Sequence, residues 1–134
     1  MKRNIFLIIL VVFWSVIILK SIFVNVDRNN NLEEGKYIFG IGIIKDYTHG
    51  SRVSPWFTYE IKYKDEIFIA DLAIKGKLRA AKNDELRKYI GKKYFVKFSI
   101  EKPKYSELYI DKPVPEDFIY KEGQTWSKIP VDYE

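Results

Sequence analysis

An apolar run near the amino terminus constrains this chain more than any other feature. Residues 5–19 hold a single polar side chain, Ser15, and the apolar character continues past Lys20 to residue 26. A helix over residues 5–26 would be about 33 Å long at ~1.5 Å per residue, which spans a hydrocarbon core about 30 Å thick. Lys20 lies near one end, where its stem can follow the helix while its ammonium reaches the headgroups. The run therefore predicts a membrane-spanning helix.

The same basic start and apolar run also describe a secretory signal peptide. No Ala or Gly lies between the run and Gly35, so the pattern lacks a small-residue cleavage site. The sequence therefore predicts an uncleaved signal anchor over residues 1–26, and a cleaved signal peptide is the second alternative. A buried core helix is the least favoured, because a segment that is apolar all round suits lipid better than a half-exposed position.

The orientation of the anchor depends on the few residues before it. Lys2 and Arg3 precede the run, while Lys20, Arg28 and Lys36 follow it, so the basic residues alone give no strong asymmetry. A short basic tail would, however, have to move outward against an inside-negative potential. We therefore expect the amino terminus inside and the remaining chain on the periplasmic or extracellular side.

The composition excludes several classes of site. The chain has 134 residues, of which 47% are hydrophobic and 31% charged, and this is typical of one ordered domain and not of a disordered polymer. It contains no cysteine, which excludes disulfides, thiolate metal sites and thiol catalysis. His49 is the only histidine. We therefore expect no cofactor and no metal site.

Beyond the anchor, the sequence predicts three segments. Residues 27–35 lack apolar periodicity and predict a linker, residues 36–115 predict one small β-domain, and residues 116–134 predict an irregular cover over it. Alternating, β-branched and aromatic runs within the domain predict five strands, at residues 36–46, 56–63, 67–74, 94–100 and 108–110.

One short helix is predicted between the third and fourth strands. Over residues 83–91, Asn83 can cap the free amides, acidic residues occupy the first turn, and Gly91 can close the helix. Three strands, a helix and two strands predict a mainly β fold, namely an OB-like, partly open five-stranded barrel. A small β-sandwich is the alternative.

Two local signals add detail to this fold. Gly40 and Gly42 lie on one face of the first strand, which indicates a bend, a bulge or the close approach of another backbone. Residues 64–66 predict the turn of a hairpin between the second and third strands.

Residues 91–114 carry a recurring pattern. It consists of Gly91, a Tyr-Phe-Val-Lys-Phe strand at 94–98, a Pro-x-x-Ser turn at 103–106, an apolar triplet at 108–110 and Asp-x-Pro-Val at 111–114. This pattern resembles that of small, uncharacterised, single-helix-anchored β-domain proteins of the Bacteroidota. The resemblance implies the fold and an envelope location, and it brings no activity with it.

The candidates for catalysis are few. His49 lies in a turn-rich loop, where it could act as a general base beside Ser51 or Asp46. An exposed loop histidine without a role is the alternative. Asp71 is predicted on the solvent side of a strand or paired with a lysine, and a carboxylate pair with Glu60 across the hairpin is the other possibility.

Charge is distributed unevenly along the domain. Residues 75–104 hold 11 Lys and Arg against 3 acidic residues, whereas residues 105–134 hold 3 against 7. Such a basic edge is suited to anionic headgroups or an acidic envelope partner, and a solvated face without a ligand is the alternative. The candidate binding surface comprises Trp56, Tyr59, Lys75, Lys77, Arg79, Lys82, Lys92 and Lys93.

We therefore expect a non-catalytic, membrane-anchored extracytoplasmic binding or interaction module, whose partner is an envelope protein or an anionic ligand. An envelope hydrolase that uses His49 is one alternative. Binding of single-stranded nucleic acid is another if the domain is cytoplasmic, since basic grooves with aromatic residues serve that role; for an extracytoplasmic domain no nucleic acid is expected. An immunity-type protein that binds a toxin is a third.

Overall fold

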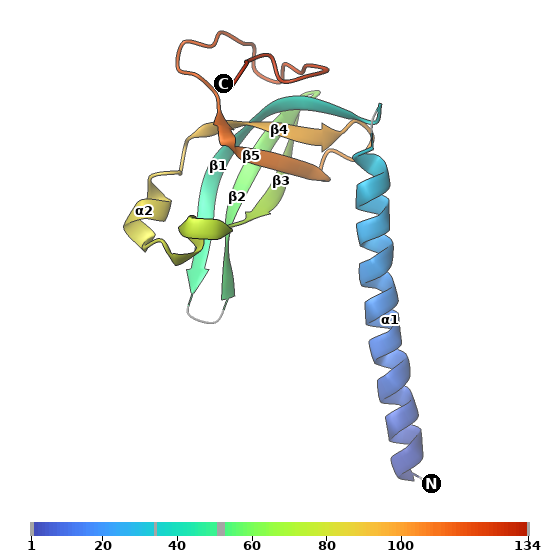
Figure 1. The fold of residues 1–134 in the computed structure, drawn as a ribbon. Coiled ribbons are helices and arrows are strands. Elements are labelled where there is room, and N and C mark those ends of the chain that lie inside the picture. Colours follow the sequence, from blue (N-terminus) through green and yellow to red (C-terminus); the bar gives the residue numbers. More distant parts are fainter. Residues whose placement is uncertain (1, 34, 51–52, 134) are drawn as a thin grey trace.

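The computed structural model describes residues 2–33, 35–50 and 53–133, and shows a long helix joined at its carboxyl end to a small β-domain (Figure 1). Helix α1 (Lys2–Asn31) is long and apolar enough to cross a membrane. The most apolar window of this helix has a mean hydropathy of 2.8, and none of that window is buried. The predicted apolar helix is therefore present, with the length that a single-pass anchor needs.

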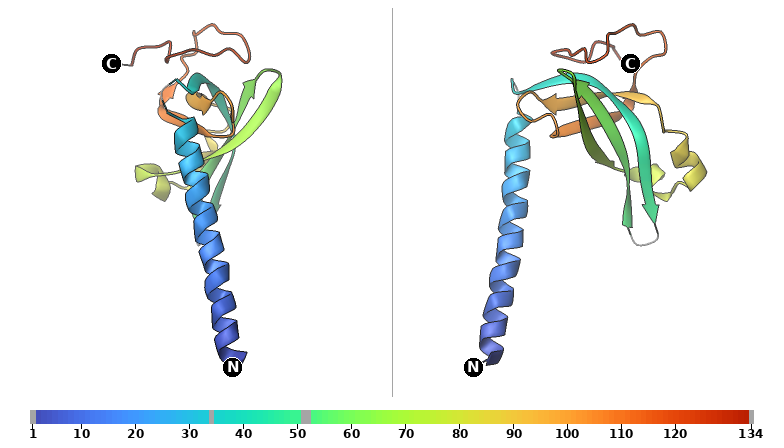
Figure 2. Two further views of the ribbon diagram at one scale, coloured as in Figure 1. Left: turned by 90° about the vertical axis from the view of Figure 1, so that its right-hand side faces the viewer. Right: turned by 180° about the vertical axis from the view of Figure 1, so that it is seen from behind.

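The domain is built on one antiparallel sheet of five strands in the order β3-β2-β1-β4-β5. The long β1 bends across the sheet and pairs with β2 along one part and with β4 along another (Figures 1 and 2). The strands are β1 (Tyr37–Gly50), β2 (Val53–Tyr63), β3 (Glu66–Ala73), β4 (Lys93–Ser99) and β5 (Ser106–Pro113).

The sheet curls but does not close. Among the described residues, β3 pairs only with β2 and β5 only with β4, so two free edges face each other across a hollow of about 270 Å³. This confirms the predicted mainly β, partly open five-stranded architecture. Because all five strands belong to a single sheet, the β-sandwich alternative, which needs two sheets, is wrong.

The core lies on the inner face of the curled sheet. Phe57, Tyr59 and Ile61 are at most 1% exposed, as the alternation of β2 predicts. On β3 the alternation also holds, and Ile67 and Ile69 point outward, with 56% and 62% of their surface exposed. The two-residue periodicity therefore assigns the faces of both strands correctly.

Gly40 and Gly42 lie where the core has no room for a side chain. A Cβ atom on Gly42 would come within 2.6 Å of Leu108 Cδ1, and one on Gly40 within 2.8 Å of Phe98 Cε1. Side chains of β2, β4 and β5 make the closest approaches to the glycines, and the predicted approach of another backbone is limited to Gln124 O, 3.8 Å from a Cβ on Gly40. A bulge follows, where the register between β1 and β2 shifts after Ile44.

A two-residue turn joins β2 to β3. Lys64 and Asp65 have φ angles of 50° and 63°, the left-handed values that a type I′ turn requires at both central positions. The predicted hairpin is therefore confirmed.

Two short helices connect β3 to β4: the 3₁₀ helix η1 (Gly76–Ala80) and α2 (Asn83–Arg87). Lys82 occupies the N-cap of α2 without a side-chain capping bond, so the predicted capping by Asn83 is wrong. Gly91 has a φ of 83° and donates its N–H to a β1 carbonyl at 2.7 Å. The chain therefore leaves the helical segment by joining β1.

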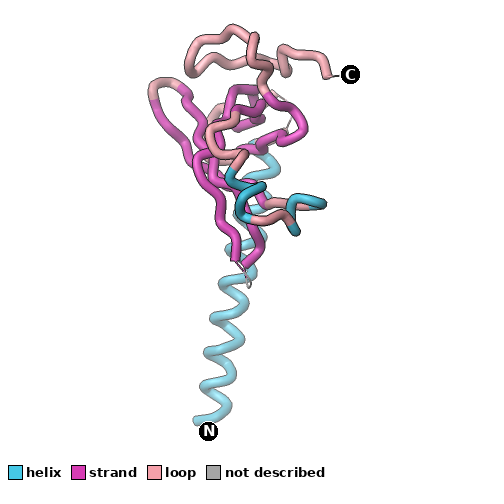
Figure 3. Tube along the Cα trace, turned by 90° about the vertical axis from the view of Figure 1, so that its left-hand side faces the viewer, coloured by secondary structure: helices cyan, strands magenta, loops and turns pink. Residues whose placement is uncertain are grey.

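The tail after β5 crosses one end of the domain as irregular structure (Figure 3). Its backbone pairs with β1, since Phe39 and Trp126 exchange two hydrogen bonds of 2.8 and 2.9 Å. The rings of Phe118 and Trp126 pack edge-on against Phe95, with centroids 5.8 and 6.0 Å away. These contacts keep the tail on the sheet without regular secondary structure.

The last turn of α1 is bound to the turn between β4 and β5. The Asp27 carboxylate accepts hydrogen bonds from Lys102 Nζ at 2.7 Å and from the Tyr105 hydroxyl at 3.0 Å. The bond to Asp27 raises the pKa of the Lys102 ammonium, which therefore stays charged at neutral pH.

Two further contacts complete this junction. Arg28 Nη2 donates to the Ser106 carbonyl at 2.9 Å, and the Ser99 hydroxyl donates to Asn31 Oδ1 at 3.2 Å. Residues 27–31 are therefore helical, where the sequence predicts a linker. The reason is tertiary support, since a helix end without an apolar stripe persists when its polar side chains find fixed partners.

Candidate functional site

The predicted binding surface divides into separate parts in the structure. One part lies in and around η1, where every basic side chain is exposed. A second part, Lys92 and Lys93, lies at the start of β4 beside the tail. We call the first part the basic edge and define it by Lys75, Lys77, Arg79 and Lys82.

The two aromatic members of the predicted surface lie on opposite faces of β2. Tyr59 is fully buried, and its hydroxyl lies 2.7 Å from Ser106 Oγ, so it is a core residue and the prediction that it belongs to the surface is wrong. Burial raises the pKa of the Tyr59 phenol, which therefore stays neutral. Trp56, an odd number of positions away on the strand, faces the other side and is half-buried.

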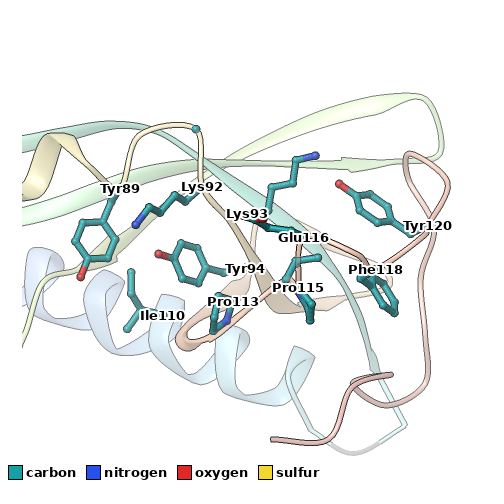
Figure 4. A pocket seen from close by; sticks show the side chains of 12 residues that line it. Tyr89, Lys92, Lys93, Tyr94, Ile110, Pro113, Pro115, Glu116, Phe118 and Tyr120 are labelled. Carbon is teal, nitrogen blue, oxygen red and sulfur yellow. The ribbon is translucent and has the colours of Figure 1, made fainter.

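A pocket of about 820 Å³ lies where the tail crosses the ends of β4 and β5 (Figure 4). Its volume falls within the ~300–1,000 Å³ of typical small-molecule sites. Ile110, Pro113 and Phe118 provide apolar walls. We call this cavity the tail pocket; its polar lining consists of Tyr89, Lys92, Lys93, Tyr94, Glu116 and Tyr120.

Both lysines of the tail pocket are held over aromatic rings. Lys92 Nζ lies 5.2 Å from the ring centroid of Tyr89, and Lys93 Nζ lies 5.3 Å from that of Tyr120. Cation–π attraction at such distances orients the ammonium groups without neutralising them. Glu116 is the one carboxylate among the lining residues, so the lining carries a net positive charge.

Tyr94 adds a neutral hydrogen-bond donor to the tail pocket. It is 4% exposed, and burial, with a smaller contribution from the neighbouring Tyr89, raises the pKa of its phenol. The hydroxyl therefore keeps its proton at neutral pH and can donate to an oxygen of a ligand.

The predicted catalytic candidates that the structure describes do not form a cluster. His49 is exposed near the end of β1, and its proposed partner Ser51 lies outside the described residues. Asp71 is on the solvent side, as predicted, and accepts a hydrogen bond of 2.8 Å from the Thr58 hydroxyl instead of pairing with a lysine. Glu60 lies opposite Ile69 in the register and pairs with a lysine of β1, so the carboxylate pair is not formed.

The sequence alone missed the contribution of the tail. Glu116, Phe118 and Tyr120 complete the pocket around Lys92 and Lys93, and the only signal for them is the spacing of aromatic residues among charges after residue 115. No protein-family model, no curated protein and no solved structure matches the chain, so its function is inferred from the geometry of its own residues.

Proposed function

We propose that this protein is a single-pass, membrane-anchored binding module that captures an acidic group in the tail pocket. The domain faces the periplasm or the cell exterior, and it binds without catalysing a reaction. The observation that carries the proposal is the pocket itself, in which two lysine ammonium groups and three phenols surround a hollow of about 820 Å³.

The lining is suited to a carboxylate or phosphate oxygen. Ammonium groups form charge-assisted hydrogen bonds with such oxygens, and these bonds are roughly twice as strong as neutral ones. Lys92 can supply one of them beside the neutral phenol of Tyr94, and Lys93, which points to the other side of the pocket toward Tyr120, can supply one to a second oxygen of a larger ligand (Figure 4). The acidic group belongs either to a small anionic ligand or to a side chain of an envelope protein.

The lining favours binding over catalysis. Among the described residues that line the pocket there is no histidine, serine or threonine, and Glu116 is the sole carboxylate. A nucleophile with an adjacent general base is therefore not part of this arrangement. The proposal accordingly assigns the lysines a binding role.

The location and fold class are parts of the same proposal. The apolar α1 supports an anchor in the cell envelope. The position of β1 between β2 and β4 supports an OB-like barrel, a class whose members commonly bind ligands.

The proposal can be tested by titrating the full chain, in lipid nanodiscs, with citrate and with inorganic phosphate. Fluorinated tyrosine gives one ¹⁹F signal per ring, and the signals of Tyr89, Tyr94 and Tyr120 are assigned with Tyr→Phe variants. We expect these three signals to shift with either anion, because Lys92 lies over Tyr89 on the side of Tyr94 and Lys93 lies over Tyr120, so an anion at either ammonium changes the field at a neighbouring ring (Figure 4).

A matched pair of variants isolates the pocket. Lys92→Gln with Lys93→Gln should abolish the shifts, whereas Lys121→Gln with Lys128→Gln removes the same charge from exposed tail positions and should leave them unchanged. Equal losses in both variants, or no shift with either anion in the unmodified chain, would contradict the proposal.

A further inference from the structure

The basic edge lies on the side of the domain toward which α1 extends. We propose that this edge contacts the acidic phospholipid headgroups of the same bilayer that holds α1, so that the domain rests on the membrane surface in one orientation. This inference depends on α1 as an anchor and is independent of what binds in the tail pocket.

The domain cannot turn freely on its anchor. Asp27 receives hydrogen bonds from Lys102 and Tyr105, at 2.7 and 3.0 Å, and Arg28 binds a β5 carbonyl at 2.9 Å. Asn31, one turn later, binds the hydroxyl of Ser99 at 3.2 Å. Contacts at three positions within residues 27–31 hold both the position and the rotation of the helix relative to the sheet.

The helix α1 and the basic edge lie on the same side of the domain. From the β4–β5 pair, α1, η1, α2 and the hairpin of β1 and β2 all extend to one side, and the tail covers the opposite side (Figures 1 and 2). Because α1 enters the bilayer from the junction, the side that carries η1 and α2 faces the bilayer. The tail faces away from it.

The positive charge of the basic edge is not neutralised by ion pairs. The four side chains of the basic edge are exposed, and none forms an ion pair with another residue in the described part of the chain. Only two acidic residues, Asp84 and Glu85, share the helical segment with them. The tail after residue 113, by contrast, holds 5 acidic residues against 2 basic ones, while Glu107 and Asp111 of β5 line the hollow beside Lys75. The positive end of the domain therefore faces the lipid, and the negative end faces away.

The distance between the basic edge and the headgroups decides whether they attract each other. Electrostatic attraction to an anionic surface falls off over about 8 Å at physiological ionic strength, so only charges near the headgroups count. The hairpin of β1 and β2 extends farther in the direction of α1 than η1 does (Figure 1). It carries the exposed, polar His49, so it is not suited to the hydrocarbon. A tilt of α1 that raises the hairpin side of the domain away from the bilayer, within the roughly 0–40° that spanning helices adopt, keeps this hairpin out of the hydrocarbon. The basic edge then lies at headgroup level.

The test uses the full chain in nanodiscs that contain a nickel-chelating lipid. The chain has no cysteine, so a single Ala80→Cys substitution in η1 accepts a nitroxide label, and Ser127→Cys labels the tail. Nickel at the headgroups accelerates nitroxide relaxation only at short range. In discs of phosphatidylglycerol mixed equally with phosphatidylcholine, we expect strong acceleration at position 80 and little at position 127.

The electrostatic part is tested by changing the lipid and the protein separately. In discs of phosphatidylcholine alone, nickel should accelerate the relaxation of the nitroxide at position 80 much less. The same loss is expected in mixed discs when Lys77, Arg79 and Lys82 are all changed to Gln. The matched control changes Lys64, Lys121 and Lys128 to Gln, which removes the same charge from exposed positions elsewhere, and it should retain the acceleration.

Two results would overturn the inference. Equal acceleration at positions 80 and 127 would mean that the basic edge does not face the lipid. The acceleration at position 80 could also be the same with and without phosphatidylglycerol, and the same with and without the triple substitution. That result would mean that the edge faces lipid without binding acidic headgroups, which would leave it available to an acidic protein partner. Because the substituted side chains are exposed, circular dichroism should show the same fold in every variant.

Discussion

At the scale of single residues, Gly42 offers a sharp test of core packing. An added Cβ would lie 2.6 Å from Leu108 Cδ1 and 3.3 Å from Tyr59 Cδ2, and both of those side chains are buried. We expect Gly42→Ala to lower the free energy of unfolding by about 1–3 kcal/mol, because overpacking forces neighbours out of their rotamers. Denaturant unfolding of the full chain in detergent micelles measures this change.

The matched control is Gly50→Ala, at the other end of the same strand. A Cβ at Gly50 meets nothing within 4 Å, and the backbone there needs no positive φ. This substitution should leave the unfolding free energy within about 0.5 kcal/mol. A loss as large as that of Gly42→Ala would show that backbone freedom, and not crowding, makes glycine necessary in β1.

The buried hydroxyl pair of Tyr59 and Ser106 gives a second prediction. Their oxygens lie 2.7 Å apart between β2 and β5. Either Tyr59→Phe or Ser106→Ala leaves one buried hydroxyl without its partner, at a cost of about 1–3 kcal/mol in unfolding free energy. The double variant should cost less than the sum of the two, because neither orphaned hydroxyl remains.

A double-mutant cycle by denaturant unfolding measures this coupling. Tyr37→Phe is the control, since Tyr37 is only half-buried and its change should be nearly neutral. Strict additivity of Tyr59→Phe and Ser106→Ala would show that the two hydroxyls do not depend on each other.

Local sequence patterns predicted the environment of many residues correctly. The alternation of Phe57, Tyr59 and Ile61 assigned the buried face of β2, because a pleated strand sends successive side chains to opposite sides. The same rule already implied that Tyr59 is buried, yet its aromatic ring near basic residues favoured a surface role. Burial was the stronger constraint, and the hydroxyl that suits a binding surface is satisfied inside by Ser106.

At the scale of elements, the end of α1 yields a third prediction. We expect Asp27→Ala combined with Arg28→Ala to free the domain from the anchor. The first substitution removes the hydrogen bonds to the turn between β4 and β5, and the second removes the hydrogen bond to the first residue of β5. Double electron–electron resonance between nitroxides at Ser21→Cys and Lys64→Cys reports the change. The distance distribution should be narrow in the unmodified chain and broad in the double variant.

The matched control for the junction is Asn29→Ala combined with Asn30→Ala, on exposed positions of the same turn. It should keep the narrow distribution. The Lys102 ammonium has a raised pKa, so its contribution is fully present at neutral pH and is lost only as the pH rises through that raised value. A distribution that broadens between neutral and mildly alkaline pH would contradict the assigned role of this contact.

The elements themselves were predictable where the information is local. All five strands and the turn at Lys64 and Asp65 follow from alternation and turn chemistry. The helical end of α1 could not be predicted in this way, because residues 27–31 carry no apolar stripe. Their helical state depends on partners more than 65 positions away in the chain, such as Ser99 and Lys102. Long-range polar contacts of this kind leave no periodicity in the sequence.

At the scale of the whole molecule, the tail pocket was out of reach of sequence reasoning for the same reason. Lys92 and Lys93 were identified as candidates from charge alone. The pocket forms only because the tail returns across the sheet, held by the backbone pair of Phe39 and Trp126 and by the ring of Phe118 against Phe95. Neither pairing can be read from spacing, since Phe39 and Trp126 are separated by most of the domain, and Phe95 and Phe118 by β5 and the loops on either side of it.

The fourth prediction concerns the side of the membrane on which the domain lies, and the envelope ligand proposed for the tail pocket depends on it. We expect protease added to intact spheroplasts to remove a tag at the carboxyl terminus of the full-length, membrane-bound chain. The physical reason is that Lys2, Arg3 and the free amine resist outward transfer against an inside-negative potential.

A variant of the amino terminus makes this prediction quantitative. Lys2→Gln with Arg3→Gln removes the basic tail and should increase the fraction of chains whose tag is protected, while Lys121→Gln with Lys128→Gln should not. A tag that is protected in the unmodified chain until lysis would place the domain in the cytoplasm. The basic edge would then face the inner leaflet, where acidic lipids are also abundant, and single-stranded nucleic acid would become an accessible ligand. The lipid contact could survive that outcome, whereas an envelope ligand for the tail pocket could not.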